Sequence, residues 1–212
     1  MRTLLLALTL VSATTPTATA ATSTVPTTTV PTTTAAIPLE AGTPLTSSTG
    51  SRCVNGFNAD GYLVLHPSCA GAGATVKGPG GGTIGPVVSA RPTYSIVKVL
   101  DPTVWDQLPR AAGTTVTGSA EAPVGGTVCM VSPTTGRRCG TVTAKNATVT
   151  FPQGTISGLT RVNLCAQPGD QWAALTSGTQ AQGHVLGGSG CSTYFQPVNR
   201  ILAAEGLTLL TW

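Results

Sequence analysis

Side chains that could perform acyl transfer are scarce in this chain of 212 residues. The reaction needs a hydroxyl nucleophile, an imidazole that takes its proton and a carboxylate that orients the imidazole. The chain has two histidines, His66 and His184, and His66 lies two positions before Ser68. The carboxylates that could orient His66 are Asp60, Asp101, Asp106 and Asp170. A hydrolase that uses His66 as its base is therefore one hypothesis, whereas we interpret His184 as a wall or surface residue rather than a ligand.

The N-terminal residues have the pattern of a secretory signal peptide. Met1 and Arg2 supply a positive start, residues 4–11 are apolar, and Ala18-Thr-Ala20 is a small-x-small cleavage site. We therefore predict a signal peptide over residues 1–20 and an exported protein. No later stretch approaches the ~20 apolar residues of a membrane span, so we expect no membrane span.

Residues 21–51 are predicted to be a disordered linker. They are rich in Thr, Ala and Pro and include the run T-S-T-V-P-T-T-T-V-P-T-T-T at residues 22–34. A stretch with so little charge and no aromatic residue cannot bury enough surface to offset the entropy lost on ordering. A mucin-like stalk whose threonines carry sugars is a compatible alternative.

The six cysteines all follow residue 50. In an exported chain an even number of cysteines predicts disulfides, although sequence alone leaves their pairing open. Metal binding is the alternative, but no two cysteines form the C-x-x-C pair typical of zinc sites. We therefore expect neither a metal ion nor a cofactor.

The composition favours a turn-rich β protein. Charged residues are only 8% of the chain, which has 26 Gly and 16 Pro. The net charge of +4 is scattered, and Arg137-Arg138 is the one basic pair, so nucleic acid is not an expected partner. Short β-type runs alternate with turn residues at residues 61–65, 94–100, 126–132, 147–151 and 161–165. This spacing is typical of an all-β sandwich or barrel.

One helix is predicted near the end of the chain. Pro197 suits a first helical turn, and an apolar face follows at Val198, Ile201 and Leu202. Gly206 is the expected helix stop, and a last strand is expected over residues 207–210.

Several segments carry motifs built around the cysteines. Their sequences are C-V-N-G-F-N-A (53–59), L-V-L-H-P-S-C (63–69), T-Y-S-I-V-K (93–98), V-C-M-V-S-P-T-T-G-R-R-C-G (128–140) and C-A-Q-P-G-D-Q-W-A-A (165–174). In this order they resemble C-x-x-G-F-N, L-T-A-G-H-C, D-Y-G-I-V-R, V-C-R-S-G-x-T-T-G-x-x-C-G and C-x-x-x-G-D-S-G-G-P. These are motifs of the streptogrisin and alpha-lytic protease branch of the chymotrypsin-fold, or trypsin-like, serine proteases.

The resemblance covers roughly residues 52–212 and implies the fold of this region. We expect one trypsin-like serine protease-fold domain there, all-β, with a chymotrypsin-like double β-barrel, an inter-barrel cleft and a C-terminal helix. The resemblance also implies three disulfides, which are Cys53–Cys69, Cys129–Cys139 and Cys165–Cys191. We expect a monomer.

The same resemblance implies that the catalytic groups have been replaced. Aligned on the cysteines, Ser68 stands at the base position, Thr93 at the acid position and Gln171 at the nucleophile position. Leu186 replaces the serine that supports the acid. Serine and threonine are not bases near neutral pH and an amide is not a nucleophile, so we predict that no catalytic residue remains at these positions.

The residues around these positions form the candidate binding cleft. They are Gly169, Asp170, Gln171, Trp172, Leu186, Gly187 and Gly188. We expect Trp172 to belong to the core rather than to fill the specificity pocket. The partner of Asp170 is expected to be Arg137, Arg138 or solvent.

Three hypotheses for the function follow. In the first, the protein is an extracellular pseudo-protease that binds another protein, or an extended peptide by strand addition at residues 186–188. In the second, it is a residual or repurposed serine-type endopeptidase or other hydrolase that uses His66. In the third, it is a wall-associated structural protein on the Thr/Pro stalk.

Overall fold

The computed structural model describes residues 35–212 except positions 112, 153 and 172. The expected signal peptide, residues 1–20, lies outside the described residues, as do Trp172 and residues 21–34 of the expected linker. These predictions therefore stay predictions.

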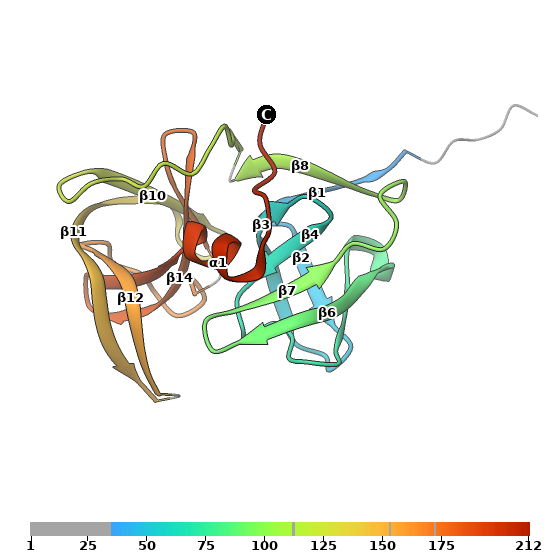
Figure 1. Ribbon diagram of the computed structural model, residues 1–212, viewed down its shortest axis with the longest axis horizontal. Coiled ribbons are helices and arrows are strands. Elements are labelled where there is room, and N and C mark those ends of the chain that lie inside the picture. Colours follow the sequence, from blue (N-terminus) through green and yellow to red (C-terminus); the bar gives the residue numbers. More distant parts are fainter. Residues whose placement is uncertain (1–34, 112, 153, 172) are drawn as a thin grey trace, which may run out of the picture. The chain divides into compact units, whose positions relative to one another are not determined.

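The first barrel is a closed ring of six strands in the order β2-β3-β4-β7-β6-β5 (Figure 1). They are β2 (Pro44–Ser47), β3 (Arg52–Ala59), β4 (Tyr62–Leu65), β5 (Thr75–Lys77), β6 (Thr83–Arg91) and β7 (Tyr94–Lys98). Strand side chains alternate between two faces, and the buried face contributes Leu45, Leu63, Leu65, Val76, Ile84 and Val97 to one apolar cluster. Trp105 belongs to the same cluster, and a Cβ on Gly78 would lie 2.5 Å from its ring, so this position requires glycine.

The second barrel closes in the same way, in the order β10-β11-β12-β15-β14-β13. Its strands are β10 (Thr127–Ser132), β11 (Gly136–Phe151), β12 (Gly154–Val162), β13 (Ala174–Ser177), β14 (Gln180–Ser189) and β15 (Ser192–Pro197). Its core includes Val128, Met130, Val142, Val162, Leu175, Val185 and Phe195. β11 and β12 form the long hairpin at the lower left of Figure 1. The expected all-β double barrel is confirmed.

A third apolar cluster joins the two barrels and the helix. It contains Phe57, Val64 and Ile96 of the first barrel and Ala174 and Ala181 of the second. The helix α1 (Val198–Glu205) packs into this cluster through Val198, Ile201 and Leu202, which are the residues of the expected apolar face. The helix ends where expected, because Gly206 adopts a left-handed conformation with φ of 64°.

The folded region begins earlier than residue 52, so the expected linker over residues 21–51 is wrong in its last part. β1 (Ile37–Ala41) pairs in parallel with β8 (Trp105–Ala111), which also pairs with the short β9 (Thr114–Thr115). β2 is part of the first barrel. Leu39 is fully buried and Leu45 is 3% exposed, so these few apolar side chains offset the cost of ordering their neighbours. Their partners lie far away in the sequence, and composition alone therefore concealed them.

Other local predictions have mixed outcomes. The expected β-type runs at residues 94–100, 126–132 and 147–151 fall largely within β7, β10 and β11. The expected last strand over residues 207–210 is wrong, because Leu209 forms only an isolated bridge with Ala59. No described helix has the length and apolar character needed to cross a membrane.

The three expected disulfides are confirmed. Cys53–Cys69 links β3 to the loop after β4, Cys129–Cys139 crosses the β10–β11 pair, and Cys165–Cys191 links the segment after β12 to the β14–β15 turn. Each bridge closes a loop and so restricts the unfolded chain more than the folded one.

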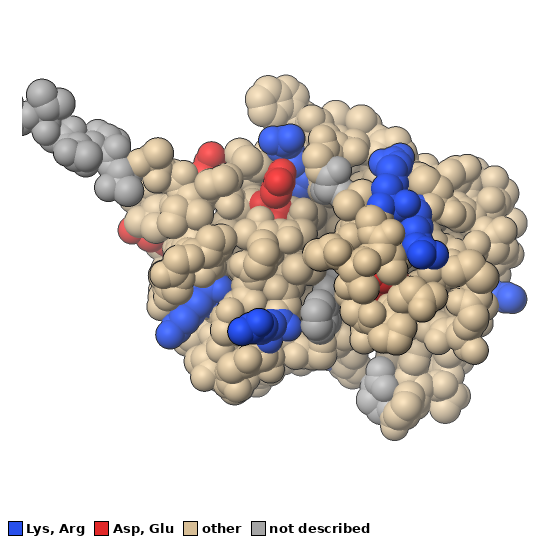
Figure 2. Space-filling view, turned by 180° about the vertical axis from the view of Figure 1, so that it is seen from behind, with Lys and Arg blue, Asp and Glu red and all other residues tan. Residues whose placement is uncertain are grey.

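Charged side chains are sparse on the surface. On the face shown in Figure 2, Lys and Arg atoms lie in separate groups with uncharged surface between them. The absence of a nucleic-acid partner stays a prediction.

Candidate functional site

Two neighbouring pockets share Leu186, Gly187 and Gly188 of β14. One has a volume of about 280 Å³, and its remaining lining residues are Ala166, Gln167, Pro168, Gln171 and Val185. The other has a volume of about 430 Å³, and its remaining lining residues are Val149, Thr150, Phe151, Pro152, Ser189 and Tyr194. The structure therefore brings the nucleophile position, Gln171, and the support position, Leu186, to one pocket, as the resemblance implied.

Leu186, Gly187 and Gly188, called here the 186–188 edge, have a β-strand neighbour on one side. Gly187 and Gly188 pair with Tyr194 and Thr193 of β15. On the other side, pairing with β13 extends only to His184 among the described residues. An edge of this kind offers backbone N–H and C=O groups to an added strand.

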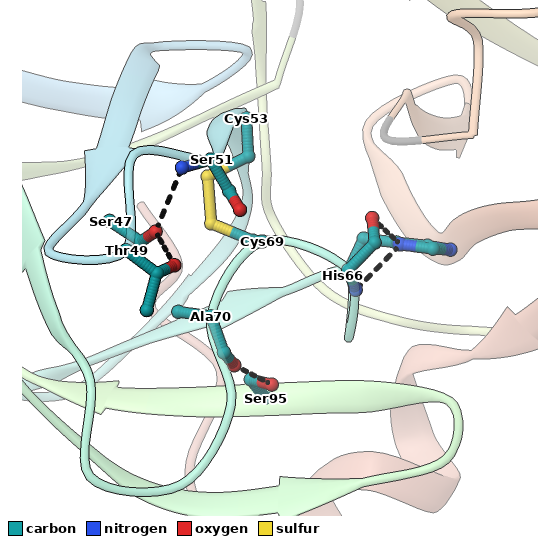
Figure 3. Close-up of a disulfide and its surroundings, with 9 residues drawn as sticks. Ser47, Thr49, Ser51, Cys53, His66, Cys69, Ala70 and Ser95 are labelled. Carbon is teal, nitrogen blue, oxygen red and sulfur yellow. Dashed lines mark hydrogen bonds between the residues drawn. A yellow bond between two sulfur atoms is a disulfide. The ribbon is translucent and has the colours of Figure 1, made fainter.

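The base position lies in a tight turn after β4. The Nδ1 atom of His66 lies 2.8 Å from the hydroxyl oxygen of Ser68 and accepts the Ser68 N–H at 3.2 Å. In Figure 3 the His66 side chain extends away from the Cys53–Cys69 bridge that anchors this turn. Burial, and secondly the proximity of His184, lowers the pKa of His66 to about 3. The ring is therefore neutral at ordinary pH and is a weak base.

The acid position is tied to the second barrel through its backbone. His184 is 1% exposed, and its Nε2 donates a hydrogen bond to the carbonyl oxygen of Thr93 at 2.8 Å. Its ring also meets the ring of His66 edge to face, with centroids 5.9 Å apart. Burial lowers the pKa of His184 to about 4, against the opposing effect of the hydrogen bond to Thr93. No described residue partners the buried Nδ1 atom of His184.

The contact between the two histidines was missed by sequence reasoning. His184 is buried and so is not a surface residue, which corrects that part of the interpretation made from sequence. No sequence pattern indicated this contact, because His66 lies in the turn after β4 and His184 lies in β14 of the other barrel.

The nucleophile position is filled by an amide that binds its own loop. The Oε1 atom of Gln171 accepts the backbone N–H of Gly169 at 2.6 Å. Gly169 has a φ of +100°, and a Cβ there would lie 2.9 Å from the hydroxyl oxygen of Thr134. This glycine therefore cannot be replaced without strain.

Asp170 is fully buried and is held by neutral donors. The hydroxyl of Thr135 donates to both carboxylate oxygens, at 3.0 and 3.1 Å, and the backbone N–H of Gln167 donates to one of them at 2.7 Å. The expected partners, Arg137, Arg138 or solvent, are therefore wrong. A hydroxyl and a backbone N–H satisfy this buried carboxylate without the desolvation of a guanidinium.

No described His, Cys, Asp or Glu side chains form a group of three that could hold a metal ion. The proposed absence of a cofactor is not tested by this observation. A separate pocket of about 550 Å³ lies beside His66, Pro67, Ser68 and Pro92 on the first barrel.

Comparison with known proteins gives consistent matches. No family model matches the chain. Streptogrisin-C of Streptomyces griseus is 42% identical over 168 residues, which make up 74% of this chain but only 35% of that protein. Glutamyl endopeptidase 2 of the same organism is 32% identical over 176 residues, or 76% of this chain and 94% of that protein. Among solved structures, Cellulomonas bogoriensis chymotrypsin is 37% identical with a TM-score of 0.73, covering 83% of this chain and all of that one.

Proposed function

Because the chain belongs to the streptogrisin and alpha-lytic protease branch of the chymotrypsin-fold serine proteases, we propose that it is an exported, catalytically inactive member that binds extended peptides. The observation that carries the proposal is the state of position 171. Where acyl transfer needs a hydroxyl beside backbone donors, this chain has an amide whose oxygen is bonded to Gly169.

The other positions support the loss of chemistry. Ser68 and Thr93 cannot take a proton near neutral pH, and the His66 imidazole, which is bonded to Ser68, has a pKa of about 3. Leu186 offers no hydroxyl to support an acid, and Thr93 has no carboxylate to be supported. A protein fold can keep its binding surface when its reaction is lost, because the two depend on different atoms.

The proposed ligand is an extended peptide added beside the 186–188 edge. Its backbone would pair with the edge, and its alternate side chains would reach the two pockets. The larger pocket has an apolar wall that includes Phe151, Pro152 and Tyr194, whereas the smaller one contains the amides of Gln167 and Gln171. The three disulfides support an oxidising, extracellular location. Cell-wall association stays a prediction, which fractionation of the producing cells would test.

A hydrolase is the second candidate, and one distance favours it. The Ser68 hydroxyl and the His66 Nδ1 atom lie 2.8 Å apart, which is the reach that a nucleophile and its base require. Three features oppose it. The pKa of His66 is about 3, far below the near-neutral value that suits a general base. No carboxylate is among the groups that shift this pKa, and the Gly169 N–H is occupied by Gln171.

Activity is tested on the purified, disulfide-bonded protein with a fluorophosphonate probe and with peptide and ester substrates. We expect neither labelling nor turnover. Labelling that disappears in both Ser68→Ala and His66→Ala would establish the hydrolase and overturn the proposal.

Binding is tested by titrating the ¹⁵N-labelled protein with a library of acetylated hexapeptide amides. We expect saturable shift changes in the amide signals of Leu186, Gly187 and Gly188. If the folded protein shows shift changes only elsewhere, or none at all, the proposed peptide site is wrong.

A further inference from the structure

The side-chain oxygen of Gln171 lies next to a backbone N–H that would receive a ligand oxygen in an active protease of this fold. In acyl-transfer enzymes of this fold, the N–H of the nucleophile and the N–H two residues before it receive the carbonyl oxygen of the substrate. The second of these donors is the N–H of Gly169 in this chain. It donates instead to the Gln171 oxygen at 2.6 Å.

The orientation of this amide is settled by hydrogen-bond chemistry. A Gln side chain ends in one acceptor atom and one donor group. Turning it around would bring the Nε2 donor against the Gly169 donor, which is repulsive. The oxygen is therefore the atom that faces Gly169.

The loop holds the Gly169 donor in place. Asp170, next to it, is fully buried and accepts hydrogen bonds from Thr135 and from the Gln167 N–H. The Asp170 N–H donates to the Gln167 oxygen at 2.9 Å, and its carbonyl oxygen accepts the Ala173 N–H at 2.9 Å. With both flanks fixed, the Gly169 N–H cannot easily turn toward another acceptor.

We propose that Gln171 is an internal ligand of the Gly169 amide that closes the site at this point. This inference rests on the proposed peptide binding. It adds that the part of the peptide that contributes to affinity lies on one side of Gln171. A peptide is held along the 186–188 edge, and residues that continue past Gln171 add nothing to its affinity. A peptide carbonyl could reach Gly169 only by expelling the tethered Gln171 oxygen, which exchanges one neutral hydrogen bond for another.

The first experiment measures hydrogen exchange of the Gly169 amide by NMR. We expect slow exchange in the wild-type protein, at least tenfold faster exchange in Gln171→Ala, and slow exchange again in Gln171→Glu, which keeps an acceptor oxygen of the same reach. Gln167→Ala is the matched control, because Gln167 lines the same pocket and its hydrogen bonds to Asp170 come from its backbone N–H and C=O groups, which the substitution keeps. If the Gly169 amide exchanges at the same rate in Gln171→Ala as in the wild-type protein, Gln171 is not its internal ligand.

The second experiment compares two probes, acetyl-Leu-Ala-Ala-Ala-amide and the same peptide continued at its C-terminal end by four alanines. The wild-type protein and Gln167→Ala should bind the two with equal affinity. In Gln171→Ala the longer peptide should gain about threefold to tenfold, the effect of one neutral hydrogen bond. Tighter binding of the longer peptide by the wild-type protein would contradict the closure.

The two proposals can fail separately. If neither probe, nor any member of the hexapeptide library, binds any variant, the proposed function fails. The exchange of the Gly169 amide still decides whether Gln171 is its internal ligand.

Discussion

On the first-barrel side of the site, polar groups are hydrogen-bonded to other protein groups, whereas on the second-barrel side the 186–188 edge has no strand partner besides β15 among the described residues. His66 is bonded to Ser68, and the Thr93 carbonyl accepts a hydrogen bond from His184. Across from them, the 186–188 edge borders two pockets, and β13 pairing extends only to His184 among the described residues. The proposed loss of catalysis concerns mainly side-chain groups, whereas the proposed peptide binding depends largely on backbone groups, so the two proposals are compatible.

The largest effect is expected from a substitution in the 186–188 edge, on the second-barrel side of the site. In Gly188→Ala the new Cβ would lie 2.1 Å from the backbone oxygen of Ser192, so the strand pair must separate. We expect the free energy of unfolding to fall by about 3 kcal/mol or more, with loss of peptide binding. Gly71→Ala on the first-barrel side is the control, since no atom lies within 4 Å of its Cβ position. Chemical denaturation of both variants measures the difference, and equal midpoints would contradict this view of the edge.

Acid should weaken the contact between the barrels. The pKa of His184 is about 4 in the folded protein, below its ordinary value of 6.5, so the unfolded chain binds the proton first as pH falls. The stability it contributes is complete above pH 6.5 and is lost progressively down to about pH 4, by about 3 kcal/mol. The free energy of unfolding is measured as a function of pH.

The matched variant for this prediction is His184→Gln, which keeps a donor for the Thr93 carbonyl but does not titrate. Its stability should depend less on pH between 6.5 and 4 than that of the wild-type protein. Parallel profiles for the two proteins would show that His184 does not carry the acid sensitivity.

The loop that carries the Gly169 donor should depend on Asp170. Replacing Asp170 with Ala leaves the Gln167 N–H and the Thr135 hydroxyl without their buried acceptor. We expect a loss of about 2 kcal/mol of unfolding free energy and faster exchange of the Gly169 amide. The exposed carboxylate of Asp106 provides a control, and Asp106→Ala should change neither quantity appreciably. A stable Asp170→Ala protein with a protected Gly169 amide would show that the loop is held by other contacts.

The smallest expected effect concerns the larger pocket beside the edge. Truncating Phe151 to Ala removes apolar surface from its wall and should weaken binding of hexapeptides about fivefold, with little change in fold. Val124→Ala, which truncates a side chain that is 61% exposed elsewhere, should have no effect on binding. Isothermal titration calorimetry measures the affinity of the two variants for hexapeptides. If Phe151→Ala binds them as tightly as Val124→Ala does, this pocket is not part of the proposed site.

Much of the fold was accessible from the sequence because its signals are local. The helix could be predicted from the apolar spacing of Val198, Ile201 and Leu202 and from the stop at Gly206. β1 could not, because the residues that bury Leu39 come from strands elsewhere in the chain. The motifs around the cysteines predicted their pairing through resemblance, whereas spacing alone had left it open.

The candidate site was predictable in its positions but not in its contacts. The resemblance placed Gln171 and Leu186 at one site, and the structure brings both to the same pocket. The Arg partners expected for Asp170 were wrong, because a nearby hydroxyl and backbone N–H satisfy it. The role of Trp172 stays a prediction.

The sequence by itself determined which chemical groups are present at each position of the site. An amide at position 171 is not a nucleophile and a hydroxyl at position 68 is not a base near neutral pH, whatever the conformation of the chain. Only the tertiary structure decided which groups meet. His184 and Thr93 are 91 residues apart, and their hydrogen bond exists because the packing of the two barrels buries the His184 side chain next to the Thr93 carbonyl. The contact between Gln171 and Gly169 likewise depends on a backbone conformation that the buried Asp170 holds in place.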